Sequence, residues 1–292
     1  MGVIGALHGN ETAGLHALER VRSEGDEFVR RMRRGTVVLI HGNPLATDQH
    51  RRHSDGGTDI NRLFKYQYVD SLAPEAWTFE HRRALELQPL VTGLDALLDL
   101  HSASRPTKPF AICDGRPAGI DLARRTGCLV TYGWDGPGML MDHVSIGSLV
   151  TQGRPALSIE CGQHDDAATI DNAWGVLTRF LGALGITDHP ASPELGPVFR
   201  LFARVVKPTH VFQLAQPFNS FDRLAPGDLL GRGEGVTISL EEEAYLLLPT
   251  PNAVRGEDLV YLAKREDEDE DDLNRQGAKV AKGFENFGSA DE

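Results

Sequence analysis

The chain has 292 residues, a formal net charge of −12, 40% hydrophobic residues and 25% charged residues. These values are typical of a globular protein with one large core, and the acidic balance argues against a nucleic-acid partner, whose phosphates attract Lys and Arg. No apolar run approaches the roughly 20 residues of a membrane-spanning helix, so no membrane partner is expected. Three cysteines without a C-x-x-C spacing predict a reducing compartment, and we expect a cytoplasmic protein.

Short apolar runs alternate with helix-like segments through the first two-thirds of the chain. Strands are expected at residues 3–7, 36–40, 94–100 and 155–159, and helices at residues 12–34, 73–90 and 167–184. Short, fully apolar strands separated by helices indicate an α/β fold, with a mostly parallel or mixed sheet flanked by helices. We therefore predict an α/β domain over residues 1–188.

The pattern changes after Gly185. Residues 186–197 are rich in proline and turn residues and are expected to form a connector. From residue 198 to residue 264, short β-rich runs alternate with turns, which predicts a smaller C-terminal all-β domain. Residues 265–292 begin with an acidic run and contain few large apolar side chains, so this tail is predicted to be disordered.

Ionisable side chains follow three of the expected strands. His8 ends the first, His101 the third and Glu160 the fourth. In open α/β sheets ligands bind at the carboxyl ends of the strands, so these side chains are expected to converge. His8, Glu11 and His101 would then form the two-histidine, one-carboxylate set that holds a catalytic zinc ion, one per chain. Glu160 would be the unligated carboxylate that takes a proton from zinc-activated water.

Two further groups of polar residues accompany this set. Asp99 precedes His101 by two residues and shares one strand face with it, where it could orient a ligand. Asn61 and Arg62 adjoin each other, and an amide beside a guanidinium grips a carboxylate through several hydrogen bonds. A second arginine, held closer to the metal, would stabilise an oxyanion.

The chain resembles the succinylglutamate desuccinylase/aspartoacylase family, which belongs to the zinc carboxypeptidase-like group. The resemblance lies in motifs that occur in family order, namely HGNE (8–11), NPLA (43–46), DINRLF (59–64), DLHS (99–102) and IECG (159–162). The β-rich segment is also similar to the C-terminal β domain of the family. The resemblance implies a zinc-carboxypeptidase-like fold and hydrolysis of a small-molecule substrate, an N-acyl amino acid, to a carboxylate and a free amine.

The matching motifs also imply roles for individual residues. They imply that His8, Glu11 and His101 bind zinc and that Glu160 is the general base. They also imply that Asn61 and Arg62 bind the substrate carboxylate. The family also carries an arginine that polarises the scissile carbonyl, usually at a position that Ser54 fills here. Arg52 lies further from Asp59, with SDGGT between them, so a small insertion is needed. We choose Arg52 for this role rather than its neighbour Arg51.

The acyl group of the substrate stays open. Aspartoacylase-type enzymes carry a substrate-binding tyrosine and arginine shortly before the base, where this chain has Ile146 and Val150. Aspartoacylase-like specificity is therefore not expected. The alternative functions are a carboxypeptidase that acts on peptides and a metal-binding protein without turnover. The sequence leaves the oligomeric state open, and a homo-oligomer is possible. Five other histidines lack a partner at useful spacing and are expected to be surface or hydrogen-bonded residues: His41, His50, His53, His143 and His164.

Overall fold

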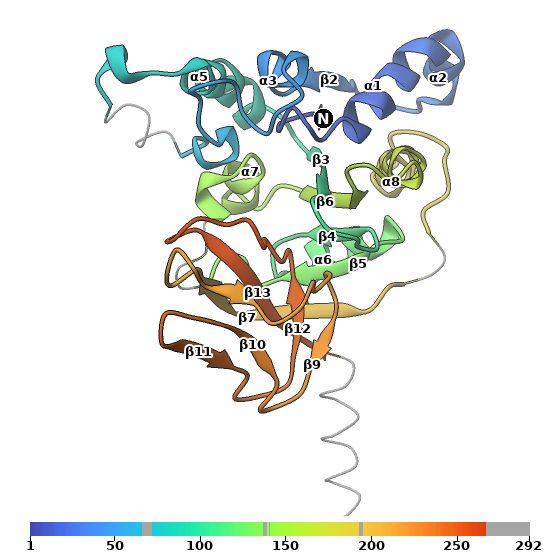
Figure 1. Ribbon diagram of the computed structural model, residues 1–292. Coiled ribbons are helices and arrows are strands. Elements are labelled where there is room, and N and C mark those ends of the chain that lie inside the picture. The colour runs from blue at the N-terminus through green and yellow to red at the C-terminus, as the bar shows by residue number, and fades with distance from the viewer. Residues whose placement is uncertain (66–71, 137–138, 140, 193–194, 267–292) are drawn as a thin grey trace, which may run out of the picture.

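A computed structural model of the protein describes residues 1–65, 72–136, 139, 141–192 and 195–266. Within these residues the chain forms a ten-stranded mixed sheet and a separate three-stranded sheet (Figure 1). The order of the large sheet is β2 (Val38–His41), β1 (Gly2–Gly5), β3 (Leu97–Ala103), β6 (Ala156–Gln163), β4 (Phe110–Ile112), β5 (Leu129–Tyr132), β7 (Val198–Val206), β13 (Asp258–Arg265), β12 (Ala244–Leu247) and β9 (Arg223–Leu224). The small sheet has the order β11 (Val236–Ser239), β10 (Leu229–Gly233) and β8 (Gln213–Leu214).

The strands that carry the expected site residues run in one direction. β1 pairs in parallel with both β2 and β3, and β3 pairs in parallel with β6. β4 is antiparallel to β6, whereas β5 and β7 return to parallel pairing. The carboxyl ends of β1, β3 and β6 therefore lie at the same edge of the sheet, which faces the viewer in Figure 1.

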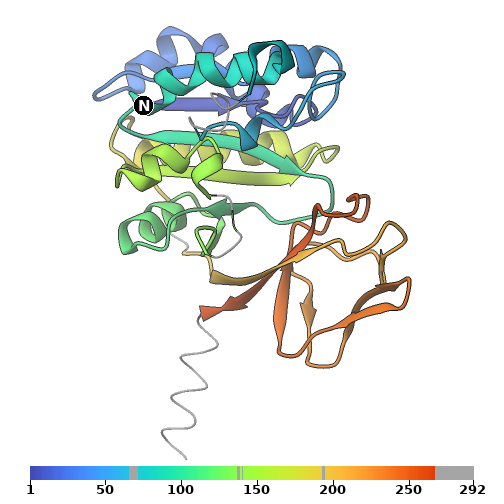
Figure 2. The ribbon, with the colours of Figure 1, turned by 90° about the vertical axis from the view of Figure 1, so that its left-hand side faces the viewer.

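Helices cover both faces of the parallel part of the sheet (Figures 1 and 2). One face carries α1 (Ala13–Glu24), α2 (Asp26–Arg31), α6 (Pro117–Arg125) and α8 (Ala168–Ala183). The other face carries α3 (Pro44–Asp48), α5 (Phe79–Thr92) and α7 (Gly147–Thr151), together with the 3₁₀ turns η1 (Ile60–Arg62), η2 (Pro74–Ala76) and η3 (Met141–His143). Among the residues that the structure describes, no helix is long and apolar enough to cross a membrane.

Two apolar cores hold these layers together because neighbouring strand residues point to opposite faces. Leu98 packs in the core beneath α1 and α8, whereas Leu97 packs in the core beneath α5 and α7. In α1 the buried residues Ala13, Ala17 and Val21 recur at helical spacing and face the sheet. Each fully buried large apolar side chain stabilises the fold by about 1.5–3 kcal/mol.

The predicted fold class, helices around a mixed sheet with a smaller β part, is confirmed. The four expected strands are present with shifted ends, but the helix expected at 12–34 is wrong, since Gly25 adopts a φ of 49° and separates α1 from α2. The helix expected at 73–90 begins only at Phe79, where Thr78 forms its N-cap. The elements β4, α6, β5 and α7 were not expected from the sequence.

The C-terminal strands continue the large sheet. Val198 of β7 pairs with Val130 of β5, so hydrogen bonding passes without interruption into the segment where an all-β domain is expected. That segment also has its own small core, which includes Phe218 and Leu246. β13 runs to Arg265, and residues 267–292, where a disordered tail is expected, lie outside the described residues.

Candidate active site

Three side chains converge at the carboxyl edge of the sheet. His8 and Glu11 lie on the turn that follows β1, and His101 lies on the neighbouring strand β3. Nδ1 of His8 is 2.8 Å from Oε1 of Glu11, and Nδ1 of His101 is 2.8 Å from Oε2 of the same carboxylate. All three residues are buried, and one ligand atom from each lies within 4.8 Å of the others. The structure therefore brings together the three residues expected to hold a metal.

The turn that carries His8 and Glu11 is packed tightly against the start of α3. Ala6 is fully buried and adopts a φ of 53°, a left-handed conformation that reverses the chain after β1. A Cβ atom at Gly9 would overlap the carbonyl group of Ala46, and one at Gly42 would overlap the backbone of Leu7. These close approaches fix the path of the turn and hence the position of both ligands.

Each histidine is held by a carboxylate at its other ring nitrogen. Nε2 of His8 lies 2.9 Å from Oδ1 of Asp59, and Nε2 of His101 lies 2.9 Å from Oδ2 of Asp99. Asp99 is fully buried and also accepts a hydrogen bond from the hydroxyl of Ser145. Such outer carboxylates fix the ring orientation of metal-binding histidines and raise their basicity.

The cluster strongly shifts the pKa values of its members. Burial alone would raise the pKa of Glu11, but the two imidazoles of His8 and His101 outweigh it and hold the pKa well below the usual value. Burial alone would lower the pKa of His101, but Asp99 and Glu11 outweigh it and raise the pKa. Burial would likewise raise the pKa of Asp59, which His8 and Arg52 instead hold low.

The donor set fits a divalent zinc ion. Two imidazoles and one carboxylate match one of the ligand sets of catalytic zinc, which leaves a coordination position free. Both Nδ1 atoms face the Glu11 carboxylate, so one donor atom from each of the three residues is turned toward the other two. Both the three candidate ligands and the carboxylates behind the two histidines are therefore of the types found at zinc sites.

Glu160 lies beside this cluster on β6. Its Cα pairs in register with that of His101, and its Oε2 is buried with no hydrogen-bond partner among the described residues. Burial raises the pKa of Glu160 to about 7, with a further contribution from the negative charge of Glu11. A carboxyl group with such a pKa can both hold and release a proton near neutral pH.

The two neighbouring arginines point to different places. Arg52 donates from Nη1 to Oε1 of Glu11 at 3.2 Å and from Nη2 to Oδ2 of Asp59 at 2.9 Å, with 46% of its side chain exposed. Burial alone would lower the pKa of Arg52, but Asp59 and Glu11 raise it. Arg51 instead pairs with the exposed Asp55 at 2.8 Å. Of the two, Arg52 is the arginine at the cluster.

Asn61 and Arg62 form part of η1, directly after Asp59. Oδ1 of Asn61 accepts the backbone N–H of Ser145 at 2.9 Å, which orients the side-chain amide of this buried residue. Arg62 donates from Nη1 to its neighbour's carbonyl oxygen at 3.1 Å. Because Ser145 also bonds to Asp99, this one serine connects Asn61 with the residue behind His101.

A further pair near the cluster was not anticipated from the sequence. The backbone N–H of Ser102 donates to Oε2 of Glu11 at 3.2 Å, and the hydroxyl of Ser102 lies 2.8 Å from Nδ1 of His164. Burial lowers the pKa of His164. Sequence spacing could not link these residues, because Ser102 lies within β3 and His164 directly follows β6. The one signal in the sequence was the position of Ser102 next to His101.

Residues 1–169 match the catalytic domain of the succinylglutamate desuccinylase/aspartoacylase family. That match covers more than half of the chain. The chain belongs to this family. The HGNE, DINRLF, DLHS and IECG motifs that are typical of the family therefore meet at one edge of the sheet in this member.

Relatives of this family member are enzymes by name. A succinylglutamate desuccinylase of Pseudomonas aeruginosa is 28% identical over 295 residues, covering 88% of this chain and 82% of the relative. An N-acyl-aromatic-L-amino acid amidohydrolase (carboxylate-forming) of Xenopus tropicalis is 28% identical, covering 90% of this chain and 84% of the relative.

Solved structures share the fold. The ectoine utilization protein EutE of Ruegeria pomeroyi, in a product-bound structure, superposes with a TM-score of 0.70 at 16% identity, covering 90% of this chain and 84% of that chain. Murine aminoacylase 3 superposes with a TM-score of 0.66 at 19% identity, covering 90% of this chain and 95% of that chain. The similarity spans the C-terminal strands as well as the helical layers.

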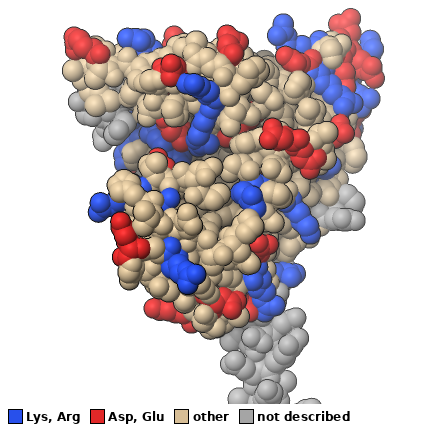
Figure 3. Space-filling model, in the orientation of Figure 1, with Lys and Arg blue, Asp and Glu red and all other residues tan. Residues whose placement is uncertain are grey.

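In this family member the C-terminal β segment contacts the loop that follows β3. Arg105 on that loop donates to the carbonyl oxygens of Pro217 and Phe218 at 3.2 and 3.3 Å, and to Oδ1 of Asn219 at 3.2 Å. Figure 3 looks onto this edge and shows Lys and Arg side chains beside a recess in the upper half of the molecule. The β segment therefore borders the region near His101.

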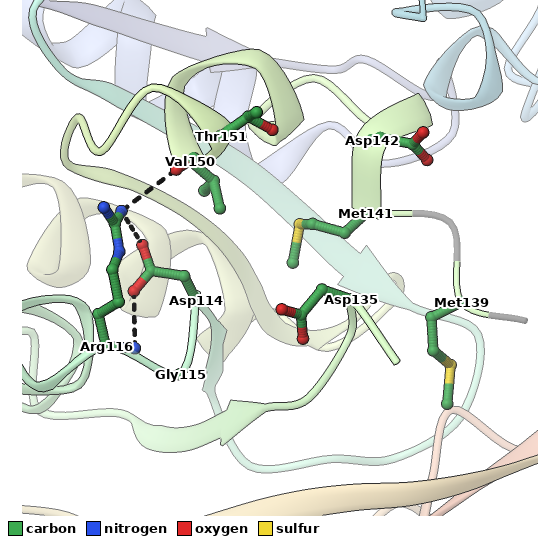
Figure 4. Close-up of a pocket in the computed structure, with 9 residues that line it drawn as sticks. All are labelled: Asp114, Gly115, Arg116, Asp135, Met139, Met141, Asp142, Val150 and Thr151. Atoms are coloured by element: carbon green, nitrogen blue, oxygen red, sulfur yellow. Dashed lines mark hydrogen bonds and ion pairs between the residues drawn. The ribbon is translucent and has the colours of Figure 1, made fainter. Parts of the chain in front are cut away.

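A separate cavity of about 640 Å³ lies away from the cluster (Figure 4). Asp114 at its edge follows β4, which runs antiparallel to β6 and so leads away from Glu160. Arg116 pairs with Asp114 and donates to the carbonyl oxygen of Val150 at 3.3 Å. None of the residues that were expected to bind metal or catalyse the reaction lines this cavity.

Proposed function

We propose that this protein is a zinc-dependent amidohydrolase that hydrolyses N-acyl amino acids. The observation that supports it most directly is the buried convergence of His8, Glu11 and His101 beside Glu160, whose Oε2 has no hydrogen-bond partner in the described part of the chain. A purely structural zinc site has no use for a free base, so the presence of Glu160 favours an enzyme over a metal-binding protein without turnover.

The chain's own residues would hold one zinc ion through Nδ1 of His8, Nδ1 of His101 and the carboxylate of Glu11. When bound, such an ion lowers the pKa of water to about 7 and polarises a carbonyl oxygen. Asp59 and Asp99 lie behind the two imidazoles and would keep them turned toward Glu11.

Glu160 is proposed as the general base and then the general acid. Its buried Oε2 takes a proton from the attacking water and delivers that proton to the nitrogen of the leaving amine. A pKa of about 7 suits both halves of this transfer, because the group is neither strongly acidic nor permanently protonated.

Three further side chains would bind and polarise the substrate. Arg52, charged and half-exposed beside Glu11, would stabilise the oxyanion that develops on the amide carbonyl. Asn61 and Arg62 would bind the carboxylate of the amino acid, through the amide N–H groups that Ser145 leaves available and through the guanidinium.

The substrate class follows from the relatives and from the β segment. The relatives are named for succinylglutamate and for N-acyl-aromatic L-amino acids, and both are small substrates. The contacts of Arg105 with residues 217–219 support a β segment close to the site, and such a segment favours a restricted cleft over the open groove of a peptidase. Ile146 is fully buried and Val150 lines the separate cavity. These apolar residues stand where aspartoacylase-type enzymes carry a substrate-binding tyrosine and arginine, so aspartoacylase-like specificity is not proposed.

We also propose a cellular compartment and a division into domains. Cys113, Cys128 and Cys161 are buried free thiols, which supports a reducing, cytoplasmic environment. We propose a catalytic α/β domain over residues 1–188 and a β domain over 198–264 that is joined to it through the pairing of β5 with β7.

The decisive experiment measures the zinc content of purified protein and the amine released from a panel of N-acyl amino acids, for the wild type and Glu160→Gln. We expect close to one zinc per chain in both proteins and turnover in the wild type that is lost on chelation and in E160Q. Asp171→Asn, an exposed acid on α8, is the matched control and should retain turnover. Zinc without turnover of N-acyl amino acids, or loss of zinc in E160Q, would contradict the proposed function or the proposed role of Glu160.

A further inference from the structure

Glu80 is a fully buried carboxylate outside the metal cluster, in the first turn of α5. Its Oε1 accepts the backbone N–H of Ser54 at 2.8 Å and the side-chain amide of Asn43 at 3.2 Å. Its Oε2 accepts the backbone N–H of Thr58 at 3.4 Å and the hydroxyl of Thr78 at 3.1 Å. Both oxygens are thus engaged by donors from three separate parts of the chain.

Two of these donors, Ser54 and Thr58, lie between Arg52 and Asp59, the two loop residues that contact the metal-ligand cluster. Ser54 follows Arg52 by two residues, and Thr58 directly precedes Asp59. Between them, Gly57 lies so close to the carboxylate that an added Cβ would overlap Oε2 of Glu80. One buried side chain therefore holds both ends of the segment Ser54–Thr58, where the sequence predicts a small insertion.

Other contacts along the segment are local: the N–H of Asp55 donates to Oε1 of Gln49 at 2.8 Å, the N–H of Gly57 donates to the carbonyl oxygen of Ser54 at 2.8 Å, and Asp55 pairs with Arg51. Asp55 and Gly56 are exposed, and Gly56 adopts a φ of 67°. Outside this segment, Arg52 donates to Glu11 and Asp59, and Asp59 contacts His8. Ordering a loop costs conformational entropy, and hydrogen bonds to a buried charge are strong and directional. The Glu80 carboxylate is the buried charge that ties this segment to the distant helix α5.

The ionisation of Glu80 agrees with this geometry. Burial alone would raise the pKa of Glu80, but the N–H of Ser54 and the amide of Asn43 outweigh it and lower the pKa to about 2. The group is therefore an anion at neutral pH, and both of its oxygens can accept hydrogen bonds there.

We propose that Glu80 is a positioning residue that sets Arg52 and Asp59 against the metal ligands by anchoring the segment Ser54–Thr58. The inference rests on the proposed function for the roles of Arg52 and Asp59, but the anchoring itself does not depend on it. Within the described residues, Glu80 forms its hydrogen bonds with Asn43, Ser54, Thr58 and Thr78 and none with the metal ligands or Glu160, so it takes no chemical step itself.

The test compares Glu80→Gln with the wild type and with Glu86→Gln, an exposed glutamate on the same helix that pairs with Arg83. Amide hydrogen exchange over residues 49–59 reports the anchoring directly and needs no activity. Zinc affinity by chelator competition and kcat and KM on the zinc-loaded proteins report its effect on the site. For E80Q we expect faster exchange at Ser54 and Thr58, and zinc affinity or kcat lowered about 10–100-fold with KM little changed.

Gly57→Ala gives a second, independent route to the same contact, since its methyl group would displace the Glu80 carboxylate without removing a charge. It should reproduce the E80Q phenotype in milder form, and it replaces E80Q if that variant does not fold. Lower thermal stability with unchanged exchange, zinc affinity and kcat would overturn the proposal and leave a merely structural role. If the wild type binds zinc without turnover, the proposed function fails while exchange and zinc affinity still decide the role of Glu80.

Discussion

Nε2 of His8 lies 2.9 Å from Oδ1 of Asp59, although 51 residues separate them in the chain. The same aspartate accepts Nη2 of Arg52 at 2.9 Å and caps η1 by accepting the backbone N–H of Asn61 at 2.9 Å. One carboxylate thus orders a proposed metal ligand, the proposed oxyanion arginine and the turn that carries the proposed substrate-binding pair.

Replacing Asp59 by Asn should weaken zinc binding. The amide cannot carry the charge that holds the His8 ring and Arg52, so we expect zinc affinity to fall about 10–100-fold in a chelator competition. Asp55→Asn, which alters only the exposed pair with Arg51, serves as the control and should bind zinc like the wild type. Equal affinities for D59N and D55N would show that Asp59 does not support His8.

Replacing Arg52 by Met should lower kcat much more than the same change at Arg51. Loss of one oxyanion donor typically costs about 10²–10³ in kcat, and Arg51 faces Asp55 rather than the cluster. Steady-state kinetics of zinc-loaded R52M and R51M on an N-acyl amino acid provide the comparison. Similar kcat values for the two variants would remove Arg52 from the proposed chemistry.

Replacing Gly9 by Ala should disrupt the ligand turn. Its methyl group would overlap the carbonyl of Ala46, a backbone atom that cannot move aside as a side chain would. Overpacking typically lowers the free energy of unfolding by about 1–3 kcal/mol, and we expect this change at the upper end of that range. It should appear as a lower midpoint in urea unfolding and as reduced zinc content. Gly93→Ala is the control, because its added Cβ meets no atom closer than 3.4 Å.

The stability that Glu80 contributes should depend on pH in a defined direction. Its pKa is about 2 in the folded protein and near 4.3 in an unfolded chain, so the unfolded state binds the proton first on acidification. The contribution is therefore complete above about pH 4.3 and is lost as the pH falls toward 2.

Thermal unfolding of wild type, E80Q and E86Q between pH 6 and 2 measures this effect. The difference between wild type and E80Q should amount to about 1–3 kcal/mol at the upper end of that range and shrink toward pH 2. E86Q should differ little from the wild type throughout, because Glu86 is exposed. A gap between wild type and E80Q that does not depend on pH would mean that the charge of Glu80 is not what stabilises the fold.

Part of the architecture could be predicted because it follows from local pattern. Alternating apolar strands and helices predicted the fold class, and strands that run in one direction must present their carboxyl ends at a common edge. This rule alone predicted that His8, His101 and Glu160 would meet. The segment between His101 and Glu160 was not predicted in detail, since β4 is only Phe110–Ile112 and is antiparallel to its neighbour β6.

The sequence by itself thus determined the fold class, the family and which ionisable residues gather at the carboxyl edge. Only the tertiary structure decided that Arg52 rather than Arg51 faces Glu11, that Ser102 meets His164, and that Glu80 anchors the loop. The physical reason is that strands and helices have a fixed side-chain period, so sequence position predicts direction. A loop has no such period, and the direction of each of its side chains is set by the particular partners that folding brings to it.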